Sequence, residues 1–357
     1  MKNSKIPYFF GDKPIFGLDI GPSSLKVMQI EQIGDQKKIL GYGFTSFERS
    51  VISDGVVVDA EKIAEAATKL FKTELIGDIT TRRVAIAIPA YRTFTRSITL
   101  PNLKAKEINE AVRLEAEQYV NVPMDQLYLD YEIIKQSAEQ IDVFIVAVPK
   151  DIVDSYLQLT QILGLETILI EPTLSSSGRL FSLDPQSDIA TVIIDFGSRS
   201  ADISIFDKHV LVTGTVQAGG EIFTNAIKDK LNVTLAEAGL IKTKYGLQLS
   251  KKQSEIKSAL DPILAEVIKE INRMNRYYEE RYGNSRPIGQ IITLGGGANM
   301  PGLSDYLTNS IRLPVRHTDP WHFISFKGLQ PPSDADKPMY ATVAGLALAN
   351  PKEVFWK

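Results

Sequence analysis

The chain of 357 residues contains no cysteine and only three histidines. The lack of cysteine excludes disulfide bonds, thiolate nucleophiles and metal sites built on sulfur ligands. No pair of histidines has the His-Glu-x-x-His spacing, which argues against a zinc site of that kind. The formal net charge of −3 leaves no basic excess, so the composition predicts no nucleic-acid partner.

Long apolar runs are also missing. A membrane-spanning helix needs about 20 apolar residues, whereas the longest run here, Ile141–Pro149, has the length of a buried strand. The N-terminal segment, residues 1–17, lacks the apolar core of a secretory signal. We therefore expect a cytoplasmic protein with no direct membrane insertion. The chain length predicts about two domains with substantial hydrophobic cores.

One pattern occurs twice in the chain. Residues Phe16–Glu31 (FGLDIGPSSLKVMQIE) and Val192–Asp207 (VIIDFGSRSADISIFD) each show an apolar strand, Asp-x-Gly, a hydroxyl-rich turn and a second strand. Both stretches therefore predict β-hairpins of the same design. The residues that align in the two copies are Asp19 with Asp195, Gly21 with Gly197, Ser24 with Ser200, and Lys26 with Asp202.

This repeated pattern suits the binding of a polyphosphate. Glycine lets backbone N–H groups approach an anion closely, and serine hydroxyls add further donors. Aspartate repels phosphate but can hold Mg²⁺ through its water ligands, and Mg²⁺ can bridge to phosphate oxygens. Two such hairpins could clamp one polyphosphate, although a single Asp-x-Gly hairpin is more typical of an ordinary turn.

A third glycine-rich segment strengthens this prediction. In Leu294–Leu303 (LGGGANMPGL) a strand runs into three glycines and then a helix, so that a flat or anionic ligand can lie against the backbone. The alternative is a tight turn between strand and helix. Elsewhere the apolar spacing predicts a small α+β segment over residues 91–148 with a helix Ala105–Tyr119, and a second helix Pro262–Tyr282.

With these motifs in this order, the chain resembles the superfamily of nucleotide-binding proteins that includes actin, Hsp70 and hexokinase. The resemblance implies an α/β fold with an actin-like (ribonuclease H-like) duplicated core that binds ATP or ADP with Mg²⁺. It implies water-mediated metal contacts for Asp19 and Asp195, and a water-positioning catalytic role for Glu171. The residues implied to bind the nucleotide are Gly21, Ser23, Ser24, Lys26, Gly197, Ser198, Arg199, Ser200, Gly219, Gly220, Lys242, Gly295, Gly296, Gly297 and Asn299.

Within this superfamily the chain resembles the PilM family of actin-like proteins, which act in type IV pilus assembly and so in cell motility. Three segments carry the resemblance: Gly17–Glu31, Leu100–Ile134 and Gln217–Ile227. The resemblance implies four subdomains. They are a first core (residues 14–90 and 149–190), an inserted small α+β subdomain of the PilM and FtsA type (91–148), a second core (191–228 and 284–350) and a helical cap (229–283).

The helical cap departs from the related proteins at one position. They carry a glutamate, which binds the ribose hydroxyls, where this chain has Gly239. The departure weakens the expected contact with adenosine. Lys242 is either a contact to the base or ribose or a solvated helix lysine.

The same residues could support ATP hydrolysis or nucleotide binding alone. We favour binding with slow or no hydrolysis, because a ligand that stabilises a scaffold needs no turnover. One alternative is an FtsA-like cell-division membrane anchor, but such chains end in a basic amphipathic helix and this sequence ends in NPKEVFWK. An alternative of a different class is a sugar or acetate-type kinase, which would lack the small inserted subdomain and would need a dedicated base at its acceptor site.

The family resemblance also implies protein partners at the inner face of the cell membrane. The cytoplasmic N-terminal tail of a PilN-like membrane protein would bind a groove beside the inserted subdomain. Other platform proteins, the assembly ATPase and further copies of the chain are additional partners to consider. Candidate groove residues are Arg92, Ile108, Val112, Leu114, Glu115 and Tyr119. For Ile108 and Val112 the alternative is that both pack the core of the subdomain.

Overall fold

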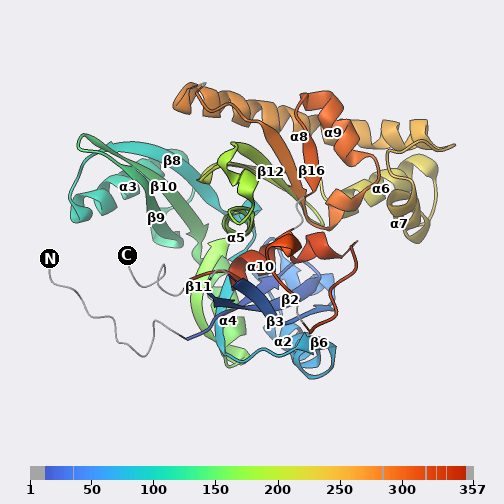
Figure 1. Cartoon of the computed structure of the whole chain (residues 1–357), viewed down its shortest axis with the longest axis horizontal. Coiled ribbons are helices and arrows are strands. Elements are labelled where there is room, and N and C mark those ends of the chain that lie inside the picture. Colours follow the sequence, from blue (N-terminus) through green and yellow to red (C-terminus); the bar gives the residue numbers. More distant parts are fainter. Residues whose placement is uncertain are drawn as a thin grey trace. The chain divides into compact units, whose positions relative to one another are not determined.

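The computed structural model describes residues 13–34, 36–283, 285–317, 320–326, 328–334 and 336–350. The chain divides into two compact units (Figure 1). The first unit comprises residues 1–180, 320–331 and 342–357, and the second comprises residues 181–319 and 332–341. Each unit is built around its own mixed β-sheet.

A six-stranded sheet forms the centre of the first unit, in the order β11-β7-β1-β2-β3-β6. β1 is antiparallel to β2 and parallel to β7, which in turn is parallel to β11. Both β1 and β7 are fully buried, which explains their near-continuous apolar sequences. The bounds are β1 (Phe16–Ile20), β2 (Ser24–Ile33), β3 (Gln36–Ser46), β6 (Leu75–Gly77), β7 (Arg83–Ile88) and β11 (Glu166–Pro172), with a small hairpin of β4 (Ile52–Ser53) and β5 (Val56–Val57) beside the sheet.

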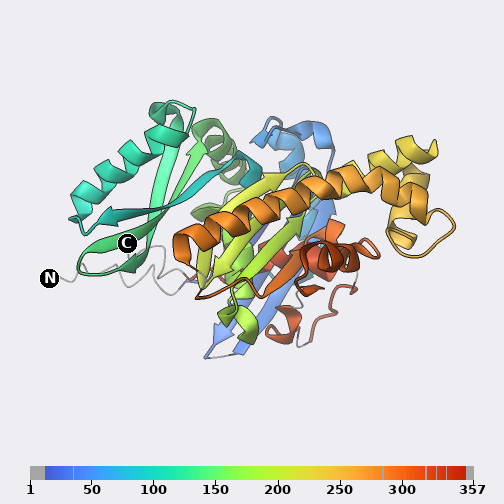
Figure 2. The same ribbon diagram turned by 90° about the horizontal axis from the view of Figure 1, so that it is seen from above.

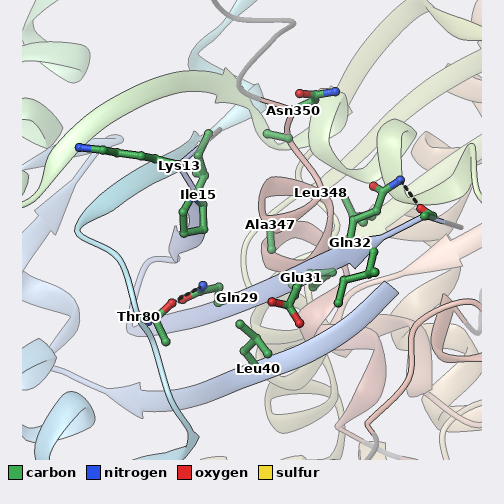
Figure 3. Close-up of a pocket in the computed structure, with 15 residues that line it drawn as sticks. Lys13, Ile15, Gln29, Glu31, Gln32, Leu40, Thr80, Ala347, Leu348 and Asn350 are labelled. Carbon is green, nitrogen blue, oxygen red and sulfur yellow. Dashed lines mark hydrogen bonds between the residues drawn. The ribbon is translucent and has the colours of Figure 1, made fainter. Parts of the chain in front are cut away.

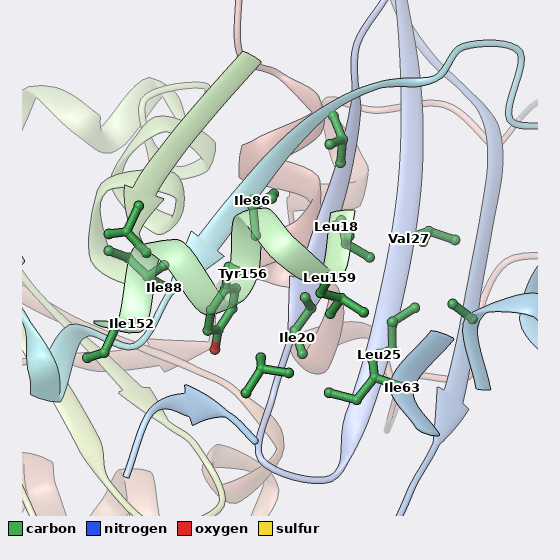
Figure 4. Close-up of a cluster of buried hydrophobic side chains, with 14 of the residues drawn as sticks. Leu18, Ile20, Leu25, Val27, Ile63, Ile86, Ile88, Ile152, Tyr156 and Leu159 are labelled. Atoms are coloured by element: carbon green, nitrogen blue, oxygen red, sulfur yellow. The ribbon is translucent and has the colours of Figure 1, made fainter. Parts of the chain in front are cut away.

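Helices cover the two faces of this sheet. On one face, α2 (Ala60–Lys69) and α4 (Lys150–Ile162) pack through an apolar cluster that includes Ile63, Tyr156 and Leu18 (Figure 4). On the other face, α10 (Ala341–Ala347) lies against β1 at Gly17, where a larger residue would meet the backbone of the helix. α5 (Thr173–Phe181) crosses α10 at Gly345.

A smaller sheet is inserted between β7 and α4. Its strands are β8 (Phe94–Pro101), β9 (Leu127–Gln136) and β10 (Gln140–Pro149), in the order β8-β10-β9 with antiparallel pairing. Helix α3 (Ala105–Tyr119) has the bounds that the sequence predicts. Its residues Ile108 and Val112 enter one apolar cluster with strand residues such as Ile98 and Val143. The insertion therefore has a core of its own.

A five-stranded sheet forms the centre of the second unit, in the order β14-β13-β12-β15-β16. Helix α8 packs along β14, where Gly214 leaves room for Glu270 and Met274, and Figure 2 shows it lying along the sheet. The bounds are β12 (Thr191–Phe196), β13 (Ala201–Asp207), β14 (His209–Val216), β15 (Gln290–Leu294), β16 (Val315–His317), α6 (Gly220–Leu231), α7 (Leu235–Lys244), α8 (Gln253–Tyr282) and α9 (Leu303–Ile311).

The two large sheets share one topology. The order β7-β1-β2-β3 in the first unit corresponds to β15-β12-β13-β14 in the second. In each case the first strand of the predicted hairpin is antiparallel to the second and parallel to a later strand. The prediction of an α/β fold with a duplicated core is thereby confirmed.

Three details differ from the sequence interpretation. Helix α8 begins at Gln253 rather than at Pro262, because Pro262 sits on an exposed part of the helix where water can satisfy the freed carbonyl. Helix α5 was not predicted. It is rich in serine and contains Gly178, so its sequence has low intrinsic helix propensity. Residues 342–350 pack in the first unit, through Gly17 and Gly345, and not in the second core.

Candidate functional site

The turn of the first hairpin is tight. The backbone N–H of Gly21 donates to the carbonyl of Ser24 at 2.8 Å, and the carbonyl of Ser23 accepts from the N–H of Phe47 at 3.0 Å. A side chain at Gly21 would come close to the hydroxyl of Ser24. The short loop thus places small and polar residues at the end of β1.

Asp19 and Lys26 form an ion pair within this hairpin. They face each other across β1 and β2, and the Lys26 ammonium donates to Asp19 Oδ2 at 2.8 Å. Both residues are buried. The first hairpin therefore carries its own counter-ion for Asp19, so Lys26 is not a free cation that waits for a phosphate.

The second hairpin repeats the turn geometry. The N–H of Gly197 donates to the carbonyl of Ser200 at 2.9 Å, which matches the bond from Gly21 to Ser24 in the first hairpin. Ser198 and Ser200 are half-buried in this turn, while Arg199 is exposed. Both copies of the pattern therefore fold alike, although their sequences share few residues.

The charges of the second hairpin differ from those of the first. Asp195 faces Asp202 across β12 and β13, in the positions that Asp19 and Lys26 occupy in the first unit. Burial, together with the charge of Asp195, raises the pKa of Asp202 to about 7. The hydroxyl of Thr215 donates to Asp202 Oδ1 at 2.8 Å and partly offsets this effect. Asp202 thus takes the position in the second hairpin that Lys26 takes in the first.

The raised pKa of Asp202 makes stability depend on pH. In the unfolded chain the pKa of an aspartate is about 3.9. Between that pH and about 7, the folded state therefore holds a proton that the unfolded state has lost. Stability is therefore lost as pH rises through this window. Asp202→Asn should raise the free energy of unfolding by about 4 kcal/mol at pH 8 and by about 1–2 kcal/mol at pH 5.

Urea unfolding at both pH values measures this difference. Asp229→Asn, at an exposed position of the second unit, is the control and should change stability little at either pH. An equal gain from Asp202→Asn at both pH values would show that the carboxyl group is not the source of the effect.

Three glycine segments meet around the start of α6 in the second unit. A Cβ atom at Gly219 would overlap the backbone of Ser198, and one at Gly297 would approach Phe196 and the N–H of Gly220. Gly295 has φ +77° and lies so close to Asp195 that a side chain would overlap the carboxylate. The backbone thus forms a compact glycine cradle, which we define as residues 197–200, 219–220 and 295–297.

The first turn of α6 and the side chain of Lys242 belong to this cradle. The N–H groups of Gly220 and Glu221 donate to the carbonyls of Gly197 and Ser198, at 2.9 and 2.8 Å. Lys242 reaches from α7 and donates to the carbonyl of Gly220 at 2.6 Å. Burial lowers the pKa of Lys242, and the charge of Glu221 opposes this shift. The Lys242 ammonium and the dipole of α6 favour an anion nearby, while the N–H groups of Gly220 and Glu221 are already used within the cradle.

Two other predicted residues lie on the open side of the cradle. Gly296 and Asn299 are exposed in the turn after β15. A Cβ atom at Gly296 would meet nothing within 4 Å, and the same holds for Gly239 on α7. The structure therefore has room for a ligand at Gly296, and it offers no carboxylate at position 239 for a ribose.

Glu171 does not fit the role predicted for it. Both of its oxygens accept from Arg179, at 2.6 and 2.7 Å, and the pair joins the end of β11 to α5. Arg179 also donates to the carbonyl of Gly345 on α10. A carboxylate held by a bidentate arginine is a poor proton acceptor for water. The sequence interpretation missed Arg179, although a buried glutamate by itself indicates that a cation lies nearby.

The predicted partner groove is only partly at the surface. Ile108 and Val112 are buried in the core of the insertion, so the alternative interpretation was right for them. Arg92 is ion-paired with Asp54 at 3.0 Å. Tyr119 is half-buried beneath the guanidinium of Arg96, and burial raises its pKa to about 12. Glu115 is half-buried, whereas Leu114 on α3 is 62% exposed.

A magnesium ion fits the second unit only through water. Among the described residues, no group of three or more histidine, aspartate or glutamate side chains is placed to hold a metal. Mg²⁺ commonly needs only one or two carboxylates when phosphates and waters complete its shell. Asp195 meets that need, because its carboxylate lies against Gly295 in the glycine cradle. In the same described part of the chain, no helix is long and apolar enough to cross a membrane.

The comparisons with known proteins agree with this architecture. Residues 17–350 match the family described as type IV pilus assembly protein PilM. The cell division protein FtsA of Enterococcus hirae is 27% identical over 333 residues, which cover 81% of this chain and 74% of that protein. The solved PilM-PilN type IV pilus biogenesis complex aligns with a TM-score of 0.80 and 23% identity, over 94% of this chain and 98% of that chain. MreB5 of Spiroplasma citri, bound to AMPPNP, aligns with a TM-score of 0.53 and 13% identity over 94% and 95% of the two chains.

The duplicated core, its paired hairpins and these structural neighbours define an actin-like protein. Since the family match extends over nearly the whole chain, the chain belongs to the PilM family of type IV pilus assembly proteins.

Proposed function

We propose that this chain is a nucleotide-binding scaffold of a type IV pilus assembly platform. In this proposal it binds ATP or ADP with Mg²⁺ and holds the cytoplasmic tail of a PilN-like membrane protein. The protein is then cytoplasmic and lies at the inner face of the membrane through its partners, which include other platform proteins and the assembly ATPase. The four subdomains expected from the family are part of the same proposal, except that residues 342–350 belong with the first core.

The glycine cradle is the observation that carries the nucleotide proposal. Backbone of three segments, the positive end of α6 and the Lys242 ammonium come together in one unit. These are the features that favour a phosphate chain. The neighbour MreB5, whose structure contains AMPPNP, has the same fold and supports a nucleotide as the ligand.

Several of the predicted residues then have a defined task. The N–H groups and hydroxyls of Ser198 and Ser200 would donate to phosphate oxygens, while Gly197 keeps the turn tight through its own bond to the Ser200 carbonyl. Asp195 would hold the Mg²⁺ ion through water, and the ion would neutralise phosphate charge. The turn of the first hairpin carries the same kind of donors in Ser23 and Ser24, and Asp19 is held there by Lys26.

The ion pair of Glu171 supports binding with slow or no hydrolysis. Hydrolysis needs a positioned water and stabilisation of developing charge. Glu171, the one catalytic candidate of the sequence, has both oxygens occupied by Arg179. A scaffold needs the bound nucleotide only for the stability that it adds to the fold, and that stability does not require hydrolysis.

The nucleotide proposal predicts a thermal shift. With Mg²⁺-ATP at about 100 times its Kd, the ligand adds about 2.7 kcal/mol to the free energy of unfolding, which corresponds to a rise in Tm of about 4 °C for a chain of this length. Asp195→Asn keeps the shape of the side chain but removes its charge, so the shift should fall below about 2 °C. Differential scanning fluorimetry with and without Mg²⁺-ATP makes the measurement. Equal shifts for parent and variant would rule out Asp195 as the metal-binding group.

The partner proposal rests on the family and on the solved PilM-PilN complex, whose fold this chain shares. The outer surface of α3 in the inserted subdomain carries Leu114, a large apolar side chain that is 62% exposed. Exposed apolar residues of this kind are candidates for contact with a partner. Glu115, Tyr119 and Arg92 are the other candidates for this contact in the proposal. The charge of Arg92 is already paired with Asp54, and the ring of Tyr119 lies under Arg96.

Leu114→Asp should weaken peptide binding without destabilising the protein. The probe is the N-terminal cytoplasmic peptide of the PilN protein from the same pilus system, followed by fluorescence anisotropy. We expect about a tenfold loss of affinity, because a polar group would replace a buried apolar contact. Leu240→Asp is the control, since Leu240 is similarly exposed on α7 of the second unit. If both variants bind as the parent does, the surface of α3 is not the peptide site.

A further inference from the structure

One edge of β2 lacks a neighbour over its outer half. β1 begins at Phe16, which pairs with Gln29, but β2 continues to Ile33. On its other side β2 pairs with β3 as far as the Ile33–Gln36 pair. Within the described residues, no strand pairs with the remaining edge of Ile30–Ile33. Open strand edges of this kind accept further strands.

The chain before β1 turns away from this edge. Pro14 has no N–H to donate, so it cannot extend the ladder with β2. Its carbonyl accepts instead from the Thr81 hydroxyl at 3.0 Å, and the carbonyl of Lys13 accepts from Arg83 at 3.3 Å. Both partners lie at the start of β7. The residues that would otherwise prolong β1 are thus held on the β7 side.

A cavity of about 580 Å³ occupies the resulting gap. Lys13–Ile15 line one side of it, Gln29–Gly34 line another, and the end of α10 with residues 347–350 closes it (Figure 3). We call this cavity the edge slot. Its volume lies within the range of about 300–1,000 Å³ that is typical of ligand sites. It lies wholly in the first unit.

The walls of the edge slot combine a fixed polar group, two charged residues of opposite sign (Lys13 and Glu31) and apolar surface. Gln29 is 1% exposed, and its amide exchanges two hydrogen bonds with Thr80, at 2.8 and 2.7 Å. Glu31 is exposed, and its carboxylate has no hydrogen-bond or ion-pair partner among the described residues. Ile15 and Leu348 add apolar contacts. A cationic side chain is the complement to Glu31.

We propose that the edge slot binds an extended peptide of a partner protein, which adds as a strand to β2 and places a cationic side chain beside Glu31. Main-chain hydrogen bonds to Ile30–Ile33 would supply affinity, and alternate side chains would supply specificity. None of the described residues that line the slot belongs to the insertion at 91–148. The slot is therefore separate from the surface of α3 proposed for the PilN-like tail, and neither proposal depends on the other.

A charge exchange tests the side-chain contact. The probe is a fluorescent seven-residue peptide of alternating valine and threonine with lysine at its centre, titrated into the full chain. We expect saturable binding, and a five- to tenfold weakening by Glu31→Lys (roughly the effect of reversing one partly exposed ion pair). A peptide with glutamate at its centre should bind the Glu31→Lys variant more tightly than it binds the parent. Glu65→Lys, at an exposed position on α2, should change neither affinity.

A change to the peptide backbone tests the strand addition. N-methylation of alternate residues removes their N–H groups and should weaken binding more than tenfold, because the ladder could not form. The proposal is overturned if the parent does not bind the lysine peptide. It is also overturned if Glu31→Lys does not reverse the charge preference, or if the N-methylated peptide binds equally well.

Discussion

Gly345→Ala should lower the free energy of unfolding by about 3 kcal/mol, because the new methyl group has no room. A Cβ atom at Gly345 would overlap the carbonyl oxygen of Ser176 where α10 crosses α5. Ser176 is fully buried, so neither helix can yield towards solvent. The gain in helix propensity from glycine to alanine is about 1 kcal/mol and does not offset the overlap. Urea denaturation measures the change.

Gly239→Ala is the matched control for this substitution. Gly239 also lies inside a helix, but a Cβ atom there would meet nothing within 4 Å. Only the higher helix propensity of alanine then affects stability, so the free energy of unfolding should rise by about 0.5–1 kcal/mol. Opposite signs for two identical substitutions would show that the crossing of α5 and α10 is the cause. Equal effects would contradict the close backbone contact at Gly345.

Gly296→Leu should abolish the thermal shift by Mg²⁺-ATP and leave the free protein unchanged. Position 296 is exposed and open, so the leucine should alter the stability of the protein alone by less than about 0.5 kcal/mol. A nucleotide that lies against the backbone of the glycine cradle would, however, collide with the new side chain. We expect at least a hundredfold loss of affinity, because several phosphate or base contacts would be lost together.

Ala236→Leu is the control for the added bulk, since Ala236 is exposed on α7 in the same unit. It should keep the full thermal shift with Mg²⁺-ATP. If Gly296→Leu binds nucleotide as the parent does, the ligand does not lie against the turn after β15. The other parts of the cradle would then have to be tested one at a time.

The elements with strong periodicity were predictable from the sequence. Helix Ala105–Tyr119 has the predicted bounds, because its flanking residues mark clear ends. The repeated hairpins were also predictable, since an apolar strand, a glycine turn and a second strand repeat in the same order. Local pattern was enough in these cases.

Features that depend on tertiary contact were not predictable. Helix α5 has weak propensity and is held by its crossing with α10. The ion pair between Glu171 and Arg179 joins residues whose roles only the fold reveals. The alignment of the two copies matched Lys26 with Asp202. Only the strand register shows that Lys26 faces Asp19 and that Asp202 faces Asp195. The electrostatic difference between the two hairpins follows from that register.

Calorimetric titration of Mg²⁺-ATP into the full chain measures the nucleotide site most directly. A nucleotide-binding scaffold predicts a stoichiometry of about one and a Kd in the micromolar range, near −8 kcal/mol. It also predicts loss of the binding heat in Asp195→Asn. If no binding is detected at about millimolar nucleotide, the binding free energy is weaker than about −4 kcal/mol. That result would contradict the proposal and would indicate an actin-like scaffold that works without a nucleotide.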